Sequence, residues 1–228
     1  MRRISDTELV RNYCEKNIGD ILDINYASEN IFVDIPHVNL RKIVSRLIDS
    51  GILRTISKGV YAIGESPLSD EERVINHYTK AASGLGVGLP VGDYLLYKKG
   101  YISNEPKEKI IKSNISKGNK KIGNVQIIES HSCFEPIGSG YDFVVAMELM
   151  TASKNIEEDK IKKYENEINA LLRNYSDMNF KAGVKDLYPG NVYYLLEHLL
   201  NVMQISNDVR GVYAIQVRLH SKEWYWVF

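Results

Sequence analysis

The chain has 228 residues, of which 44% are apolar and 25% charged, an ordinary composition for a globular protein of one or two domains. Its longest apolar runs are shorter than a membrane span, its first ten residues lack the apolar core of a secretory signal, and two cysteines are too few for a disulfide framework or thiolate metal cage. We therefore expect a reduced, cytoplasmic setting.

The net charge of zero hides an uneven distribution of charged side chains. Residues 36–60 carry five basic side chains against one acid, and residues 95–125 carry eight lysines against two glutamates. Residues 126–228 carry ten basic side chains against fourteen acids. Local charge matters more than the sum for binding nucleic acid, so the two basic segments are the candidate contact surfaces.

The N-terminal part predicts three helices. Ser5 and Glu8 have the spacing of a capping box and predict a first helix, and a short second helix is expected within residues 20–31. Asp34 and Pro36 suit the cap and first turn of a third helix. The buried face of this third helix follows helical spacing and consists of Leu40, Ile43, Val44, Leu47 and Ile48.

A hairpin is predicted directly after the third helix. Gly51 ends the helix, and two apolar runs over residues 52–64 flank a turn that contains Gly59, with Tyr61 expected to pack on the helical core. The order helix, short helix, helix, two-stranded wing is that of a winged helix-turn-helix. The polar, proline-containing residues 65–70 mark a boundary, which predicts domains at 1–66 and 67–228.

The third helix and the hairpin carry the candidate DNA contacts. An α-helix fits the major groove, and its outward face must then supply hydrogen-bonding and cationic side chains, while the hairpin reaches backbone phosphates. A solvated amphipathic helix and hairpin is the alternative interpretation. The candidate residues are His37, Asn39, Arg41, Lys42, Ser45 and Arg46 on the helix and Arg54 and Lys58 on the hairpin.

The remainder predicts a mixed α/β C-terminal domain, and the whole chain an α+β fold. A short helix at 70–80 precedes β-rich pieces separated by Gly, Asn, Pro and Lys turns, which favour an antiparallel sheet. The apolar run FVVAMELM fits either a buried strand or the start of a helix. Helices are expected at about 155–175 and 190–203, and GVYAIQVRL and WYWVF are expected to pair as a terminal hairpin.

The lysine-rich segment is either a solvated face or a cationic surface for an acidic partner or nucleic acid. Its lysines are interleaved with tyrosines. They are Lys98, Lys99, Lys107, Lys109, Lys112, Lys117, Lys120 and Lys121. The alternating Trp224, Trp226 and Phe228 share one strand face, which is expected to be core or a partner-binding patch.

Motifs for catalysis, metals and cofactors are weak. The glycine-rich stretch from Gly84 to Gly92 lacks the Gly-Lys-Ser/Thr ending of a phosphate loop, and no histidine pair has metal-ligand spacing. Asp142, Glu148 and Lys154 do not match the tight spacing of a nuclease motif. We therefore predict no catalytic residue, no metal and no cofactor.

The segment VNLRKIVSRLIDSGILRTISKGVYAI resembles the end of the winged-helix unit of AbiEi-type antitoxins, the regulators of type IV abortive-infection toxin–antitoxin pairs. That family has a helix ending Leu-x-x-Leu-x-x-x-Gly, then a basic strand and the pattern Arg/Lys-Gly-Val/Leu-Tyr. The stretches VGDYLLYKKGYISNEPKEKIIKSN and KKIGNVQII resemble a second conserved region, so the resemblance covers about residues 1–130. The places of the first pattern, the helix end, strand and turn, are filled here by Val44, Leu47, Gly51, Leu53, Lys58, Gly59, Val60 and Tyr61.

The resemblance implies a repressor that binds inverted repeats of double-stranded DNA in the promoter of its own operon. It also implies an antitoxin that counters a nucleotidyltransferase-like toxin, with no stable complex required and no enzymatic activity of this chain. Two alternatives remain open: a metal-dependent nuclease with a winged-helix DNA-targeting domain, and a winged-helix module that binds only protein.

Overall fold

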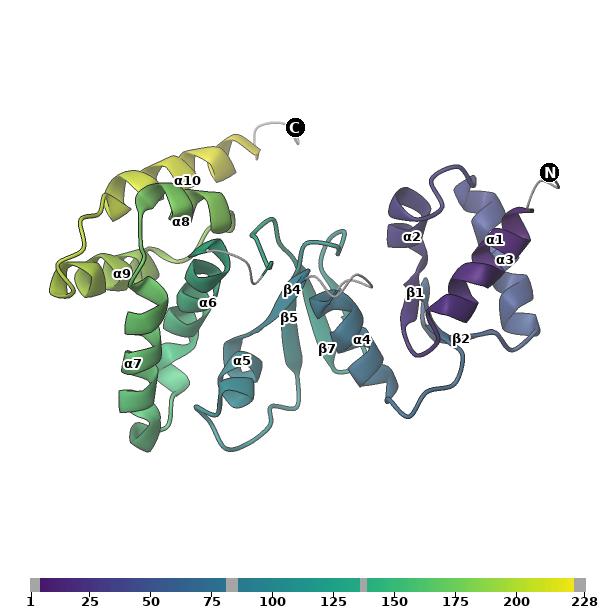
Figure 1. The fold of residues 1–228 in the computed structure, drawn as a ribbon, viewed down its shortest axis with the longest axis horizontal. Helices are drawn as coiled ribbons and strands as arrows, with labels where there is room; N and C mark the ends of the chain where they lie inside the picture. Colours follow the sequence, from purple (N-terminus) through teal and green to yellow (C-terminus); the bar gives the residue numbers. More distant parts are fainter. Residues whose placement is uncertain (1–4, 81–85, 136–138, 224–228) are drawn as a thin grey trace.

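The computed structural model describes residues 5–80, 86–135 and 139–223, and these form a mixed α+β protein with two small sheets, as predicted for the fold class. Figure 1 shows three parts along the long axis. We call them the N-terminal unit (5–64), the central unit (70–129) and the helical unit (139–223). Among the described residues, no helix combines the length and the apolar character that crossing a bilayer requires.

The N-terminal unit contains the three predicted helices, the predicted hairpin and one strand that was not predicted. Its elements are α1 (Asp6–Lys16), β1 (Ile21–Asp23), α2 (Ile24–Asn30), α3 (His37–Asp49), β2 (Leu53–Ser57) and β3 (Val60–Ile63). The three strands form an antiparallel sheet in the order β1-β3-β2. All three residues of β1 are buried, so its sequence lacks the alternation that reveals a half-buried strand.

Local sequence signals set most of the boundaries in this unit. The Ser5 hydroxyl accepts a hydrogen bond from the Glu8 amide at 3.3 Å, which caps α1. Gly51 and Gly59 have φ of +76° and +81°, as the helix stop and the hairpin turn require. The predicted cap at Asp34 is wrong, because α3 begins after Pro36 and no side chain caps it. Tyr61 packs against the core beneath α3, as expected.

The central unit is a four-stranded sheet with two helices. It comprises α4 (Asp70–Thr79), β4 (Gly88–Val91), α5 (Gly92–Lys99), β5 (Lys109–Ser113), β6 (Lys120–Ile122) and β7 (Val125–Glu129). The strand order is β4-β5-β7-β6, and β5 and β7 run parallel, so the prediction of an antiparallel sheet is wrong for the central pair. The chain passes through the edge strand β6 before returning beside β5 in the same direction.

The helical unit comprises α6 (Ser139–Ala152), α7 (Ile161–Leu172), α8 (Asp177–Gly183), α9 (Gly190–Val202) and α10 (Val209–Glu223), with 3₁₀ turns at Ser153–Asn155 and Glu158–Lys160. The run FVVAMELM lies within α6 and is buried throughout, so it is a helix. The predicted terminal hairpin is wrong for GVYAIQVRL, which is part of α10. Its buried Val209, Val212 and Gln216 follow helical spacing. The segment WYWVF lies outside the described residues.

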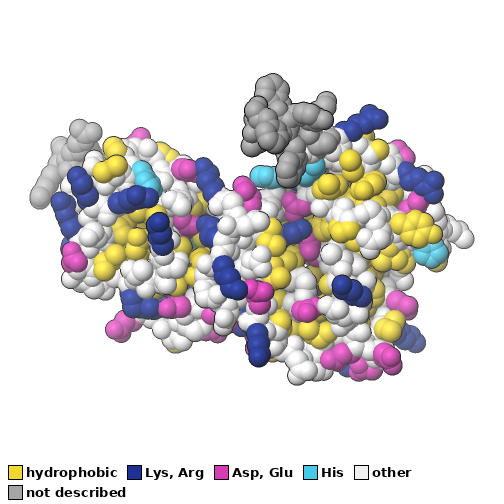
Figure 2. Space-filling model, turned by 180° about the vertical axis from the view of Figure 1, so that it is seen from behind, with side chains coloured by type: hydrophobic (Ala, Val, Ile, Leu, Met, Phe, Trp, Pro, Cys, Tyr) yellow, Lys and Arg dark blue, Asp and Glu magenta, His cyan; other side chains and the backbone are white. Residues whose placement is uncertain are grey.

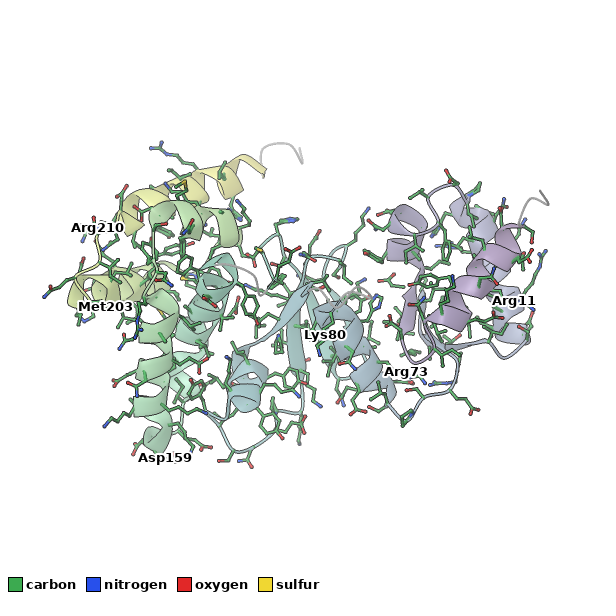
Figure 3. The ribbon with its side chains drawn as sticks, viewed as in Figure 1. Arg11, Arg73, Lys80, Asp159, Met203 and Arg210 are labelled. Atoms are coloured by element: carbon green, nitrogen blue, oxygen red, sulfur yellow. The ribbon has the colours of Figure 1, made fainter. Side chains whose placement is uncertain are left out.

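The N-terminal and central units share a core. Ile21 on β1 and Val60 on β3 pack with Val74 and Tyr78 of α4 and with apolar residues of β5, β6 and β7. The buried Arg73, labelled in Figure 3, donates hydrogen bonds to the Gly64 carbonyl oxygen at 3.1 Å. The predicted boundary therefore falls in the segment between β3 and α4, while packing continues across it.

Candidate nucleic-acid interface

The outward face of α3 is polar and open to solvent. Leu40, Ile43, Val44 and Leu47 bury one side of the helix, as predicted. The predicted contact residues lie off that side: Asn39, Arg41, Lys42, Ser45 and Arg46 are exposed, and His37 is half-buried. In Figure 1, α3 lies in the part of the molecule farthest from the helical unit, so the helical unit does not cover it.

The cations of this face have no carboxylate partner. Arg41, Lys42, Arg46 and the hairpin's Lys58 are exposed, and no Asp or Glu of the described residues lies within ion-pair distance of them. Figure 2, which views the molecule from behind, shows Lys and Arg side chains spread over the N-terminal unit at the left. Arg11 on α1, labelled in Figure 3, is exposed at the same end of the molecule. These side chains present positive charge that nothing within the described chain neutralises.

Arg54 is placed differently from the other hairpin cation. Its guanidinium donates two hydrogen bonds to the carboxylate of Asp70, at 2.9 and 2.5 Å, where α4 begins. The hydrogen bond from Arg54 lowers the pKa of Asp70, and the bond to Asp70 raises the pKa of Arg54. Arg54 therefore reaches toward the central unit, and its charge is already balanced.

The lysine-rich segment does not form a free cationic surface. Six of its eight lysines meet carboxylates, two of them on the N-terminal unit and two on the helical unit. Lys98 lies over the Tyr94 ring at 5.5 Å, and Lys107 is exposed. The pairs are Lys99–Glu167, Lys109–Glu71, Lys112–Glu148, Lys117–Glu29, Lys120–Asp23 and Lys121–Glu108.

Acidic side chains of the N-terminal unit contact basic side chains of the central unit. Asp23, which is buried, accepts from Lys120 at 2.8 Å and from the Tyr78 hydroxyl at 2.6 Å. Burial alone would raise the pKa of Asp23, but the hydrogen bonds from Lys120 and Tyr78 lower it below its usual value. Asp20 meets the His77 ring at 3.1 Å, and Glu29 pairs with Lys117. The side of the unit that faces the sheet thus contains carboxylates that side chains of the central unit contact.

A second charged cluster joins the sheet to the helical unit. Lys112 lies 2.6 Å from Glu148 and 3.4 Å from Asp186, and its ammonium is 4.4 Å from the centre of the Tyr188 ring. Burial would lower the pKa of Lys112, but the two carboxylates raise it. Glu148 also accepts a hydrogen bond from the Tyr188 hydroxyl at 2.6 Å, so both of its contacts lie within this cluster. The structure does not bring Lys154 into it.

The glycine-rich stretch has a packing role where it is described. Residues 81–85 lie outside the described residues, and Gly88 is the first residue of β4. A Cβ at Gly88 would collide with the carbonyl oxygens of Tyr78 and Lys112, so only glycine fits there. A cavity of about 390 Å³ lies beside it, with Lys80 and Lys98 among the residues that line it. No group of three His, Cys, Asp or Glu side chains within the described ranges is placed to hold a metal ion.

One residue of the α3 face is absent from the predicted contacts. Val38 is 65% exposed and lies one turn before Arg41 and Lys42. Helical geometry puts position 38 opposite the buried Leu40 and Val44, and a helical-wheel projection of the sequence alone would have shown this.

No family model matches this chain, and no curated protein matches it. The chain is similar in structure to the RV2827C protein of Mycobacterium tuberculosis, with a TM-score of 0.36 and 12% identity over 87% of this chain and 79% of that one.

Proposed function

We propose that this protein binds double-stranded DNA through α3 and the β2–β3 turn. The observation that carries the proposal is the contrast between two sets of cations. Arg41, Lys42 and Arg46 are exposed on one helix face without a carboxylate partner, whereas most lysines of the central unit are paired. Unpaired cations on a helix are what a phosphate backbone attracts.

The order of elements supports the same proposal. A helix, a strand, two helices and a hairpin, with the strands in the order β1-β3-β2, fit a winged helix-turn-helix in which α3 enters the major groove. In that arrangement Lys58, in the turn of the hairpin, contacts a phosphate. Arg54 contributes less than its sequence position suggests, since Asp70 holds it.

The biological role that we propose is that of an autorepressor and antitoxin of an abortive-infection system. It rests on the resemblance of residues 38–63 to AbiEi-type antitoxins. The toxin would be a nucleotidyltransferase-like protein encoded beside it. Co-expression with that neighbouring protein tests the role: this chain should restore growth, and a chain that fails to do so is not the antitoxin.

DNA binding is tested by replacing Arg41, Lys42 and Arg46 together with alanine. The matched control replaces Lys162, Arg173 and Lys181, three exposed cations of the helical unit, and removes the same charge. The α3 variant should lose affinity for every duplex, and the slope of log K against log salt should fall by about two to three units, while the control keeps both. Equal losses in the two variants would contradict the proposed interface.

A further inference from the structure

We infer that Val38 is a base-reading residue that contacts the methyl group of a thymine in the major groove. The inference rests on the proposed DNA binding and names what one position of that site recognises. It begins with the place of Val38 on α3, near the N-terminal end of the helix. In helix-turn-helix proteins, this end of the recognition helix contacts base edges.

Helical geometry centres Val38 on the outward face. At 100° per residue, positions 38, 42, 45 and 49 lie opposite the buried side formed by Leu40, Ile43, Val44 and Leu47. Arg41 and Arg46 flank this line on its two sides. When this face approaches DNA with Arg41 and Arg46 toward the two phosphate backbones, Val38 therefore lies toward the floor of the major groove.

The chemistry of Val38 differs from that of every neighbour on this face. Lys42, Ser45 and Asp49 are polar or charged, while Val38 is an apolar residue with two methyl groups and is 65% exposed. The major groove presents one apolar group, the 5-methyl of thymine, and small apolar side chains contact it. Val38 is not part of the core and cannot bind a phosphate, so the thymine methyl group is the partner that it can contact in the major groove.

Replacing thymine by deoxyuridine removes only that methyl group, which gives a direct test. The full-length protein first selects a duplex from a random-sequence library, and each thymine of that duplex is then replaced singly by deoxyuridine. At fixed salt, one or a few positions should weaken binding on the order of fourfold, the effect of exposing one methyl group. The variant Val38→Ala, which lacks both Cγ methyl groups, should show a clearly smaller loss at these positions.

The control variant is Val202→Ala, which alters a valine of 67% exposure on α9, in the helical unit. It should keep the deoxyuridine profile of the unaltered protein. Two results would overturn the inference and leave the proposed DNA binding standing. One is tight binding that no deoxyuridine replacement weakens, and the other is the same deoxyuridine profile in Val38→Ala as in the unaltered protein. Absence of binding to any duplex at low salt would overturn both.

Discussion

At the scale of single residues, the basic side chains differ in whether a carboxylate neutralises them. Lys120, Lys112 and Arg54 meet acids within 2.8 Å, whereas Arg41, Lys42 and Arg46 do not. The number of charges in a segment is visible in the sequence, but most of the pairing is not, because many partners lie far along the chain. Lys120 and Asp23, for example, are 97 residues apart.

Asp70 limits the charge that the hairpin offers to DNA. Replacing Asp70 with asparagine removes the carboxylate that holds Arg54, so Arg54 becomes available to a phosphate. We expect higher affinity for all duplexes and a salt slope steeper by about one unit. Affinity and slope are measured by titration at several salt concentrations.

Two further variants make this test specific. Asp159→Asn, in the helical unit and labelled in Figure 3, changes the net charge equally and should leave binding unchanged. In a chain that carries Arg54→Ala, the Asp70 substitution should have no effect on the slope. A steeper slope without Arg54 would show that Asp70 acts through another cation.

Lys112 forms a buried ion pair with Glu148, and breaking this pair should destabilise the fold. Replacing it with methionine leaves Glu148, whose side chain is 4% exposed, as an uncompensated charge. We expect a loss of about 3–5 kcal/mol in the free energy of unfolding, measured with urea. A second change, Glu148→Gln, should recover most of the loss and keep an acceptor for Tyr188.

The exposed pair of Lys117 with Glu29 provides the comparison. Lys117→Met removes the same charge from a side chain that is 65% exposed and should cost less than about 1 kcal/mol. Losses of similar size at Lys117 and Lys112 would show that burial does not decide the strength of these pairs.

At the scale of elements, local signals predicted α3 and the hairpin, and non-local packing decided what the sequence did not reveal. The spacing of Leu40, Ile43, Val44 and Leu47 and the glycines at 51 and 59 are sufficient for these elements. The parallel pairing of β5 with β7 leaves no local trace. In α10, the polar Gln216 interrupts the apolar helical pattern, and it can be buried because its side chain donates a hydrogen bond to the Val184 carbonyl at 2.8 Å. The remaining Val, Tyr and Ile residues of this segment have the composition of a strand.

We expect the contact of β1 with β6 and α4 to depend on the ionised form of Asp23. Its pKa is lowered in the folded chain, so its stabilising effect is complete above the pKa of about 3.9 for an unfolded aspartate. The effect is lost as the pH falls through the lower folded value. Asp23→Asn should therefore be less stable than the unaltered protein at pH 7, with a difference that shrinks below about pH 4.

Urea unfolding at several pH values measures this difference. Asp34→Asn, which alters an exposed carboxylate of the same unit, should show a small difference at every pH. A constant difference between Asp23→Asn and the unaltered protein would mean that the carboxylate's ionisation does not stabilise this contact.

At the scale of the whole molecule, the N-terminal unit has two sides with opposite properties. One side turns apolar residues and carboxylates toward the central unit, where Ile21, Val60 and Asp23 are buried. The other carries the unpaired cations of α3. The acids that contact the central unit and the unpaired cations of α3 therefore lie on different sides of the unit, which places positive charge where the proposed DNA contact needs it.

This arrangement predicts that a fragment of residues 1–66 is much less stable than the same unit in the full chain. Cutting after residue 66 exposes Ile21 and Val60 to water. It also removes the hydrogen bonds that Asp23 accepts from α4 and β6. Hydrogen exchange should accordingly be faster for the amides of β1 and β3 in the fragment.

The substitution Ile21→Ala separates shared packing from a general effect of truncation. It should cost about 2–5 kcal/mol in the full chain, where Ile21 is fully buried, and clearly less in the fragment, where water already reaches that side of β1. Equal costs in the two contexts would mean that residues 1–66 form an independent domain, as the sequence boundary alone suggests, and that the core shared with α4, β5, β6 and β7 adds no stability to it.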